Sequence, residues 1–487
     1  MPLQDEFTLT LESPDFPCDD LEVHTFSGKE AISRLFEYEL GIVCRHHHGP
    51  DADAMTGAHV TLVLERFEGA GASWHGVRRL HGVVAEVDDL LAGHADLRVY
   101  HLRVVPRAFA LTLVETQDIF MGVSVPEIVQ QKLAAVNLGD AMALRLEGQY
   151  ATREFVVQYK ESDLAFVARL AEHLGVSFFF EHGDAGETMV FADHRAGFGR
   201  VDEGAPIVFH PRGERLDVFA LEAKRRMIPA YYAVRDYNYR TPLLELTSEH
   251  ELPAGFAGGV IELGTHHKTP EEGDALAKVR AEERLASQLV YTGRSTVPAL
   301  GAGLRFTLQD HPDLGTIELL VTEVEHRAER VVAGLGRQGE PGYVNTFKAI
   351  PADRTYRPAR TTPRPRIGGL VTGIVDAGPV GGTPKYAQLD EQGRYMVRFL
   401  FDTTAPGERP ASRPVRMLQN HAGEGYGTHF PIKPGVEVAI GFIDGDPDRP
   451  LIVGAVPNPI KPSPVTNANP GVHRVRTSTG ITVDMAE

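Results

Sequence analysis

Apolar and polar residues alternate along most of the first hundred positions. The alternating or continuous apolar segments are residues 7–11, 21–26, 35–43, 60–65, 80–87 and 100–105. A period of two is that of a half-buried β-strand, because successive side chains point to opposite faces. The series predicts an antiparallel β unit, closed as a barrel over residues 1–110, in which Pro106 ends the last strand.

The period changes after residue 110. Residues 125–136 and 162–173 each place apolar side chains on one helical face, and Ser162 is the expected N-cap of the second helix. The two stripes, which are typical of core positions, are Ile128, Val129, Leu133 and Val136, and Leu164, Val167, Leu170 and Leu174. Strands are expected at 154–158, 176–181 and 188–192. Residues 111–204 are therefore predicted to form an α+β insert.

Strand-like alternation returns beyond the insert, at residues 218–226, 230–238, 244–250, 304–308 and 319–325. Residues 270–292 predict one long helix, because they are rich in Ala, Leu, Lys and Glu and begin with acidic residues. Residues 205–352 therefore predict a second β-barrel that carries a long helix. The segment DRTYRPARTTPRPR, residues 353–366, is the predicted linker: its prolines favour an extended backbone, and we expect its five arginines to keep it solvated.

A small β domain is predicted at 367–458. Its expected strands are residues 370–375, 386–389, 395–401, 413–418, 437–442 and 451–456, with a turn at 390–393. This number of short strands is that of an OB-fold barrel. Residues 459–487 begin rich in proline and end in an alternating stretch, 472–485, for which we find no partner strand within the chain.

An acidic turn joins the last two strands of the small domain. Two prolines lack backbone donors and one glycine permits positive φ, so residues 444–450 predict an exposed turn. Its three aspartates match the first ligand positions of an EF-hand loop: Asp444, Asp446 and Asp448. Ala455 stands where that loop needs a glutamate, and the prolines break the loop, so we expect a closing hairpin rather than a calcium site.

The composition narrows the possible partners. The chain of 487 residues has a net charge of −17 and a pI near 5.7. This argues against general nucleic-acid binding and against adhesion to anionic membranes, which both need basic surfaces. Cys18 and Cys44 form no zinc or disulfide pattern, so we expect free thiols. The N-terminal segment lacks the features of a secretory signal, and no apolar run approaches the ~18 residues of a membrane helix.

Histidine clusters are the remaining candidates for a metal site. His46, His47 and His48 are adjacent, and three neighbours in an extended chain cannot all face one ion; His266 and His267 give an equally weak signal. The sequence contains no serine-hydrolase elbow, HExxH motif, Walker A motif or dinucleotide fingerprint. Trp74 is the only tryptophan, which argues against a carbohydrate-binding cleft. We therefore predict a non-enzymatic protein, with no catalytic, cofactor-binding or metal-binding residues and no cofactor.

Five motifs in order resemble the VgrG family, the spike proteins of bacterial type VI secretion systems. They are FSGKEAISRLFEYEL at 26–40, VQYKESDLAFVARLAE at 157–172, DEQGRYMVRF at 390–399, GEGYG at 423–427, and PGVEV at 434–438 with GDPDRP at 445–450. Together they cover essentially the whole chain, and their combination is far more specific than any one of them.

The resemblance implies a fold similar to the hub and spike of a contractile phage tail. A hub-like base with two β-barrels would precede the OB barrel and the start of a trimeric β-prism needle. Family members are homotrimers that dock on the inner-tube ring protein and carry a tip protein or effector. The resemblance also implies a protein that is cytoplasmic before firing, is delivered to the target cell without a signal peptide and meets the target membrane only transiently. Only residues 471–487 would begin the needle, and we expect no C-terminal effector domain.

Two alternatives stay open from the residues alone. An OB-fold module could bind a glycan or single-stranded nucleic acid through aromatic residues on one strand: Tyr395, Phe399 and Phe401, with Arg398. Alternation argues against this, since Phe399 and Phe401 are buried if Arg398 faces outward. The other alternative is a cell-wall hydrolase, whose paired carboxylates have no sequence signature.

Overall fold

The computed structural model describes residues 7–45, 49–66, 76–90, 97–201, 207–211, 217–330, 342–377, 385–404 and 411–486. The chain forms two compact units. The large unit comprises Met1–Val114, Val129–Tyr150 and Asp163–Pro363, and the small unit comprises Glu115–Ile128, Ala151–Ser162 and Arg364–Glu487. The predicted insert, 111–204, thus contributes to both units. The histidines 46–48 and Trp74 lie outside the described residues.

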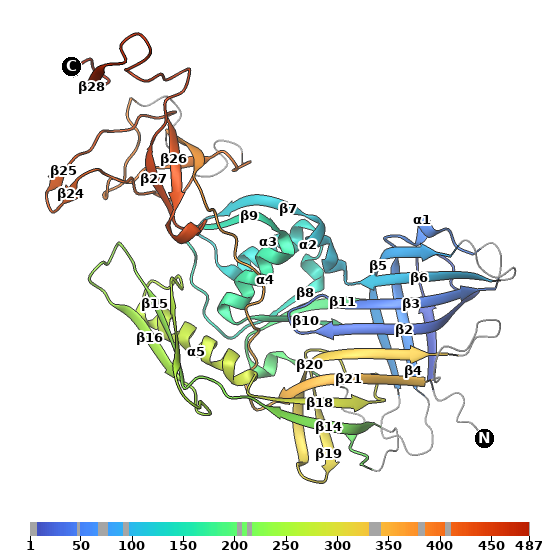
Figure 1. The fold of residues 1–487 in the computed structure, drawn as a ribbon. Coiled ribbons are helices and arrows are strands. Elements are labelled where there is room, and N and C mark those ends of the chain that lie inside the picture. The colour runs from blue at the N-terminus through green and yellow to red at the C-terminus, as the bar shows by residue number, and fades with distance from the viewer. Residues whose placement is uncertain are drawn as a thin grey trace, which may run out of the picture. The chain divides into compact units, whose positions relative to one another are not determined.

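A 13-stranded sheet dominates the large unit (Figure 1). Its strands are β1 (Phe7–Glu12), β2 (Leu21–Ala31), β3 (Glu37–Cys44), β4 (His59–Arg66), β5 (Gly76–Asp89), β6 (Arg98–Val105), β12 (Gly199–Arg200), β13 (Ile207–Val208), β14 (Val218–Arg225), β18 (Leu289–Ser295), β19 (Leu304–His311), β20 (Gly315–Glu329) and β21 (Gly342–Pro351). The main path runs β1-β4-β5-β6-β3-β2-β20-β21-β18-β14, and β19 pairs with β20. The two β regions predicted from alternation therefore join in one sheet, through antiparallel pairing of β2 with β20 from Thr25↔Glu329 to Ala31↔Glu323.

Several hydrophobic clusters of the described residues lie on this sheet, as expected for strands with alternating inward side chains, and two of them are made mainly from its strands. The first is built mainly from β1–β6, with Phe26, Tyr38, Leu40 and Tyr100 among its fully buried side chains. The second is built from the strands of the later β region around Phe306 and Phe347. Strand pairing joins the two regions, while each keeps its own apolar core.

The insert supplies helices α2 (Ala110–Leu113), α3 (Val125–Ala135) and α4 (Asp163–Leu174), and a sheet of β8 (Met142–Arg145), β10 (Ser177–His182) and β11 (Glu187–Ala192). A further short helix, α1 (Ala52–Met55), lies between β3 and β4. The predicted hairpin corresponds to β10 and β11, paired from Ser177↔Ala192 to His182↔Glu187. Helix α4 begins at Asp163, directly after strand β9 (Val156–Ser162).

The long helix is shorter than the sequence predicted. Helix α5 (Pro270–Ala286) starts with Thr269 as N-cap, whose side chain accepts a hydrogen bond from the Glu272 amide, and with Pro270 in its first turn. The prediction of helix to residue 292 was wrong, because 289–295 form β18, which pairs with both β14 and β21. Val290, Tyr291 and Thr292 have side chains that favour strands. Helix α5 packs on β15 (Tyr231–Asp236) and β16 (Leu246–Glu251), and β17 (Gly259–Leu263) pairs with β15.

The predicted solvated linker is instead a strap, residues 353–363, held to the large unit by charged hydrogen bonds. The Arg357 guanidinium pairs with Glu282 at 2.7 Å and donates to the backbone carbonyl of Asp193 at 2.6 Å. Arg360 pairs with Glu262 at 2.6 Å. The side chains of Arg357 and Arg360 are only 13% and 29% exposed. The expectation of solvated arginines was therefore wrong for these two residues, because acidic residues of α5 and β17 neutralise them in partly buried positions.

The small unit contains a four-stranded sheet in the order β23-β22-β26-β27. Its strands are β22 (Val371–Val375), β23 (Val397–Phe399), β26 (Glu437–Phe442) and β27 (Pro450–Ala455). The segments 386–389 and 413–418, predicted as strands, make only isolated bridges such as Leu389↔Tyr395 and Tyr395↔Val415. Strand β7 (Glu115–Phe120) pairs with β9, and Ile119, Phe155 and Val157 share one core with the sheet. Residues of the insert thus complete the barrel core.

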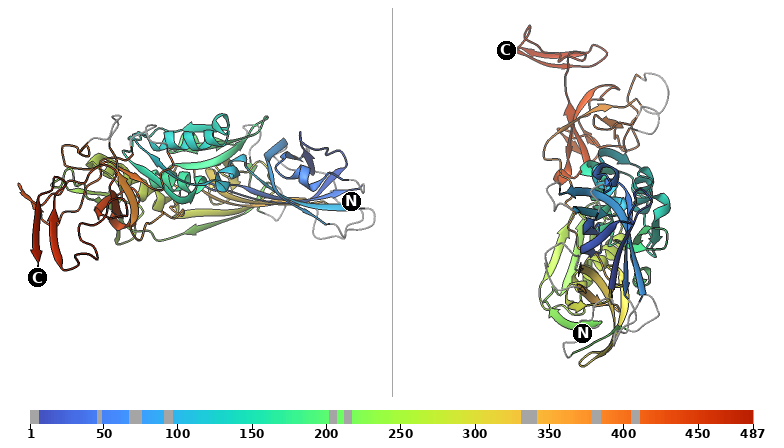
Figure 2. Two further views of the ribbon diagram at one scale, coloured as in Figure 1. Left: turned by 90° about the horizontal axis from the view of Figure 1, so that it is seen from above. Right: turned by 90° about the vertical axis from the view of Figure 1, so that its right-hand side faces the viewer.

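The tail folds on itself. Strands β28 (Val472–Arg476) and β29 (Thr482–Ala486) pair antiparallel, with Val475 opposite Val483 (Figure 2). The expectation that residues 472–485 lack a partner strand was therefore wrong: each half of the stretch is the partner of the other. Gly480, with φ of 97°, supplies the turn that a continuous strand would not allow.

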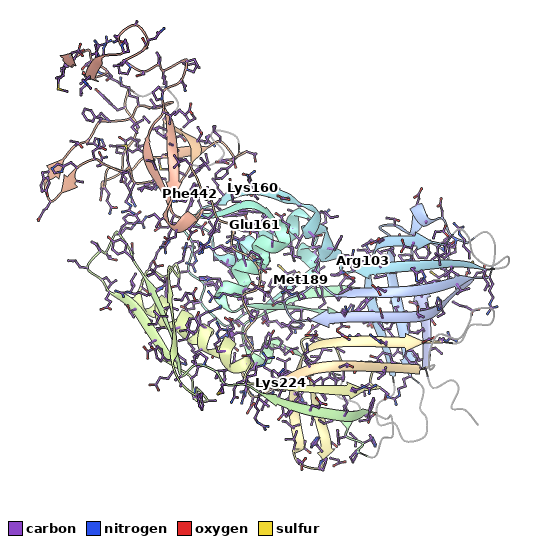
Figure 3. All side chains as sticks on the ribbon, viewed as in Figure 1. Arg103, Lys160, Glu161, Met189, Lys224 and Phe442 are labelled. Atoms are coloured by element: carbon purple, nitrogen blue, oxygen red, sulfur yellow. The ribbon has the colours of Figure 1, made fainter. Side chains whose placement is uncertain are left out.

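The acidic turn between β26 and β27 is more buried than predicted. Phe442 ends β26 (Figure 3), and a short 3-10 turn, Ile443–Gly445, follows. Asp446, Pro447 and Pro450 are buried. The expectation of an exposed turn was wrong at these residues because Arg364 neutralises the aspartates: it pairs with Asp446 at 3.0 Å and with Asp448 at 3.5 Å. Arg413 donates to the backbone carbonyl of Asp448 at 3.0 Å. The Asp448 carboxylate also accepts the Val157 amide at 2.7 Å.

Candidate functional site

The weak metal and aromatic candidates that lie within the described residues do not come together as a site. Within the described residues, no group of three or more His, Cys, Asp or Glu side chains is placed to hold a metal ion. His267 is buried, and one of its ring nitrogens lies 2.9 Å from the Thr265 hydroxyl, whereas the His266 amide donates to Asp236. Tyr395 and Phe399 are 0% and 1% exposed in the barrel core, so they offer no stacking surface for a base.

A buried carboxylate lies where the two β regions join. The Glu30 side chain on β2 accepts hydrogen bonds from Arg78 on β5 at 2.7 Å and from the Tyr38 hydroxyl at 2.9 Å. Its other oxygen accepts the Ala302 amide at 3.1 Å. His326 on β20 lies 3.1 Å from Glu30, and its second ring nitrogen is 2.6 Å from the Tyr343 hydroxyl. These contacts tie strands from both β regions to one side chain.

The pKa values of this cluster are displaced in consistent directions. Burial alone would raise the pKa of Glu30, but Arg78 and His326 together hold it well below its usual range. Burial lowers the pKa of His326, and burial also lowers the pKa of His182, which faces the same cluster, to about 3. The cluster therefore keeps one carboxylate ionised and its two histidines neutral. Sequence reasoning missed it, although Glu30 shares the inward phase of β2 with Phe26 and Gly28.

We expect the large unit to lose stability as the pH falls from 7 to 5. The folded-state pKa values of His182 and His326 are lowered, so below about pH 6.5 the unfolded chain binds protons that the folded chain does not. Stability therefore rises with pH in this window. The variants His182→Gln and His326→Gln should flatten the dependence of the urea midpoint on pH. An unaltered slope in both buried variants would contradict this assignment.

The small unit exposes apolar surface that it does not cover itself. Among the described residues, most of the exposed large apolar side chains belong to this unit, although it has less than half of the residues of the chain. They include Leu370, Leu400, Phe430 and Ile460, with exposed fractions from 62% to 88%. Exposed apolar surface of this density is typical of protein–protein interfaces.

The tail hairpin has one apolar and one charged face. Directly opposed residues of an antiparallel pair share a face, so Val475 and Val483 lie on the same side as Met485. The exposed fractions of these three side chains are 43%, 56% and 59%. The other face carries the bidentate ion pair of Arg474 with Asp484, with both N–O distances at 2.8 Å. A two-stranded hairpin is at best marginally stable alone, so we expect this apolar face to pack against another surface.

The described residues contain no helix whose length and apolar character would allow it to cross a membrane. The candidate functional surfaces are the exposed apolar side chains of the small unit and the apolar face of the tail hairpin. Sequence reasoning predicted no site residues, and alternation in the tail was the one signal that pointed to these surfaces.

Two family models match the chain. Residues 29–332 match the phage tail baseplate hub (GPD), and residues 386–456 match the type VI secretion system/phage-baseplate injector OB domain. The first match includes most of the large sheet, and the second includes β23, β26 and β27. The chain is therefore similar to contractile-tail proteins in both of its units.

Curated relatives and a solved structure agree with the two family matches. The chain is 31% identical over 482 residues to the type VI secretion system spike protein VgrG5 of Pseudomonas aeruginosa, covering 93% of this chain and 57% of that protein. It is 30% identical to VgrG1a of the same organism, covering 90% of this chain and 68% of that protein. The chain thus spans little more than half the length of VgrG5.

The E. coli c3393 protein, described as a type VI secretion component similar in structure to the phage T4 tail proteins gp27 and gp5, matches at a TM-score of 0.64 and 25% identity. That match covers 92% of this chain and all of c3393. The hub and OB matches, the long alignments to spike proteins and the shared fold agree over both units. This chain belongs to the VgrG family of type VI secretion system spike proteins.

Proposed function

We propose that this chain is a structural subunit of a type VI secretion spike, assembled as a homotrimer. Family membership supports a role in the type VI secretion machine, and the exposed apolar face of the tail hairpin supports self-association. Three copies related by a threefold axis bring three such faces together, which buries Val475, Val483 and Met485 and leaves the Arg474–Asp484 pair outside. The tail hairpin is the observation that carries the proposal.

We assign the proposed roles to the domains that the sequence predicts. Residues 1–110 and 205–352, with the insert 111–204 between them, form the base that docks on the inner-tube ring protein. Residues 353–366 connect this base to the OB barrel at 367–458, and 459–487 begin the needle. An effector or tip protein binds at the needle end, and the assembly punctures the target membrane. The subunit itself acts by packing and without catalysis, waits in the cytoplasm and leaves the cell when the machine fires.

The mass of the purified chain tests the trimer. Light scattering at micromolar concentration should give about 160 kDa, three times the chain mass of 53.3 kDa. Placing a charge on the apolar face with Val483→Asp should shift the mass to that of a single chain, because three carboxylates would meet near the axis. The matched control is Thr482→Asp on the charged face of the same hairpin, which should keep the trimer. A stable monomer of the unaltered chain would refute the proposal.

A further inference from the structure

A hairpin arm extends from the barrel of the small unit (Figure 1). It comprises residues 421–430, in which β24 (Ala422–Gly423) and β25 (Tyr426–Gly427) flank a turn with Gly425 at φ of 73°. Every residue of the arm is exposed, and Tyr426 and Phe430 are 61% and 63% exposed. Only two residue pairs join the strands, and so short a hairpin is not stable by itself in water. The arm therefore needs a surface to pack against.

The same unit presents an apolar sheet face. On β26, Val438 and Ile440 point into the core, so Ala439 and Gly441 face outward. A Cβ added to Gly441 would lie 3.2 Å from the Val453 side chain and 3.5 Å from that of Leu370. The Leu370 and Val453 side chains therefore close over the Gly441 backbone and form an apolar surface, and they are 62% and 40% exposed. An aromatic ring packs on an apolar surface of this kind.

Charges at the arm and at the sheet face are complementary. Glu424 lies exposed in the turn of the arm, two residues before Tyr426. Arg366 is exposed at one end of the sheet face, where its Cβ lies 3.5 Å from the position of a Cβ on Gly445. Neither Glu424 nor Arg366 makes an ion pair with another described residue. An acidic tip and a basic edge steer two surfaces into one register.

We propose that the arm of one chain packs on the sheet face of the next chain in the trimer. Tyr426 packs on the Leu370 and Val453 side chains over Gly441, and Glu424 lies toward Arg366. The inference rests on the proposed trimer. Arm and face are both exposed in the single chain, so the contact joins two different surfaces of two copies, and a threefold rotation closes it into a ring. A buried aromatic anchor is a common centre of such an interface.

Photo-cross-linking of the full chain tests this contact. The photoreactive residue p-benzoylphenylalanine replaces Tyr426, whose exposure makes the substitution compatible with folding. Irradiation should give a denatured species of twice the 53.3 kDa chain mass, with the link mapped by mass spectrometry to residues 370, 439–441 or 451–455. Adding Val453→Glu should abolish this species. The same probe at Val77, exposed on β5 of the large unit, is the matched control and should give no link to these residues.

The outcomes separate this inference from the trimer itself. Light scattering on the probe-bearing protein before irradiation establishes its mass. A trimer whose links fall on other segments of the chain, or that gives no linked species, overturns the arm contact and leaves the trimer standing. A protein that remains at 53.3 kDa overturns both. A link to a co-purifying protein in place of a second chain also overturns the inference, because the occupant is then a different molecule.

Discussion

Replacing Glu30 with Ala is expected to lower the free energy of unfolding of the large unit by about 3–5 kcal/mol, the usual cost of breaking a buried ion pair from one side. The change leaves the Arg78 guanidinium, 11% exposed, without its carboxylate partner. It also removes the acceptor of the Tyr38 hydroxyl and of the Ala302 amide. Urea denaturation followed by circular dichroism measures the loss.

Two controls sharpen this expectation. Glu323 pairs with Lys348 at 2.9 Å with side chains 40% and 50% exposed, so Glu323→Ala should cost about 1 kcal/mol or less. The double variant Glu30→Gln/Arg78→Met removes both buried charges, so it should recover part of the stability that either single variant loses. If Glu30→Ala costs no more than Glu323→Ala, the cluster does not hold the two β regions together.

Replacing Glu172 with Ala is expected to release the strap and to expose it to trypsin. Glu172 is 2% exposed at the end of α4. It accepts the amides of Thr361 and Thr362 at 3.0 and 2.9 Å and both of their hydroxyls. Hydrogen bonds to a charged acceptor contribute about 1.5–3 kcal/mol each, so losing four of them should free this segment.

Limited proteolysis of the full chain measures the release. Cleavage after Arg360 requires its side chain to leave Glu262, and the rate follows the population of the open strap. A loss of about 2.8 kcal/mol speeds cleavage about a hundredfold. Glu172→Gln retains one carbonyl acceptor and should give an intermediate rate, and Glu271→Ala, exposed in the first turn of α5, should match the unaltered chain. Equal cleavage rates in all four proteins would show that the hydrogen bonds to Glu172 do not restrain the strap.

The motifs that suggested the family contain the residues that make these contacts. Glu30 and Tyr38 lie in the segment 26–40, and Glu172 ends the segment 157–172. Asp390 and Arg394, in the third motif, pair at 2.6 Å and close the turn into β23. In the acidic turn, the carboxylates of Asp446 and Asp448 pair with Arg364, and that of Asp448 also accepts the Val157 amide, so both carboxylates are satisfied without a calcium ion. The motifs thus mark ionic and turn contacts that support the fold.

The sequence alone determined the local elements and the family. Alternation predicted β2–β6 and the hairpin of β10 and β11, because the side chains of a half-buried strand point alternately to the core and to solvent, and its sequence therefore alternates between apolar and polar residues. The helical stripes predicted α3 and α4 for the same reason. The motif order then indicated the VgrG family, which the comparisons confirm.

Only the tertiary structure decided which distant segments meet. Pairing of β2 with β20 joins residues about 300 positions apart, and no periodicity encodes that choice. Residues 289–295 became a strand because β14 and β21 supply hydrogen-bonding edges on both sides, which overrides the helix propensity of the preceding run. Two arginines that were predicted to be solvated, Arg357 and Arg360, are partly buried and form ion pairs. Local sequence could not predict this, because their acidic partners, Glu282 and Glu262, lie far away in sequence. Burial and ion pairing depend on partners brought together by the fold, and a local pattern cannot contain them.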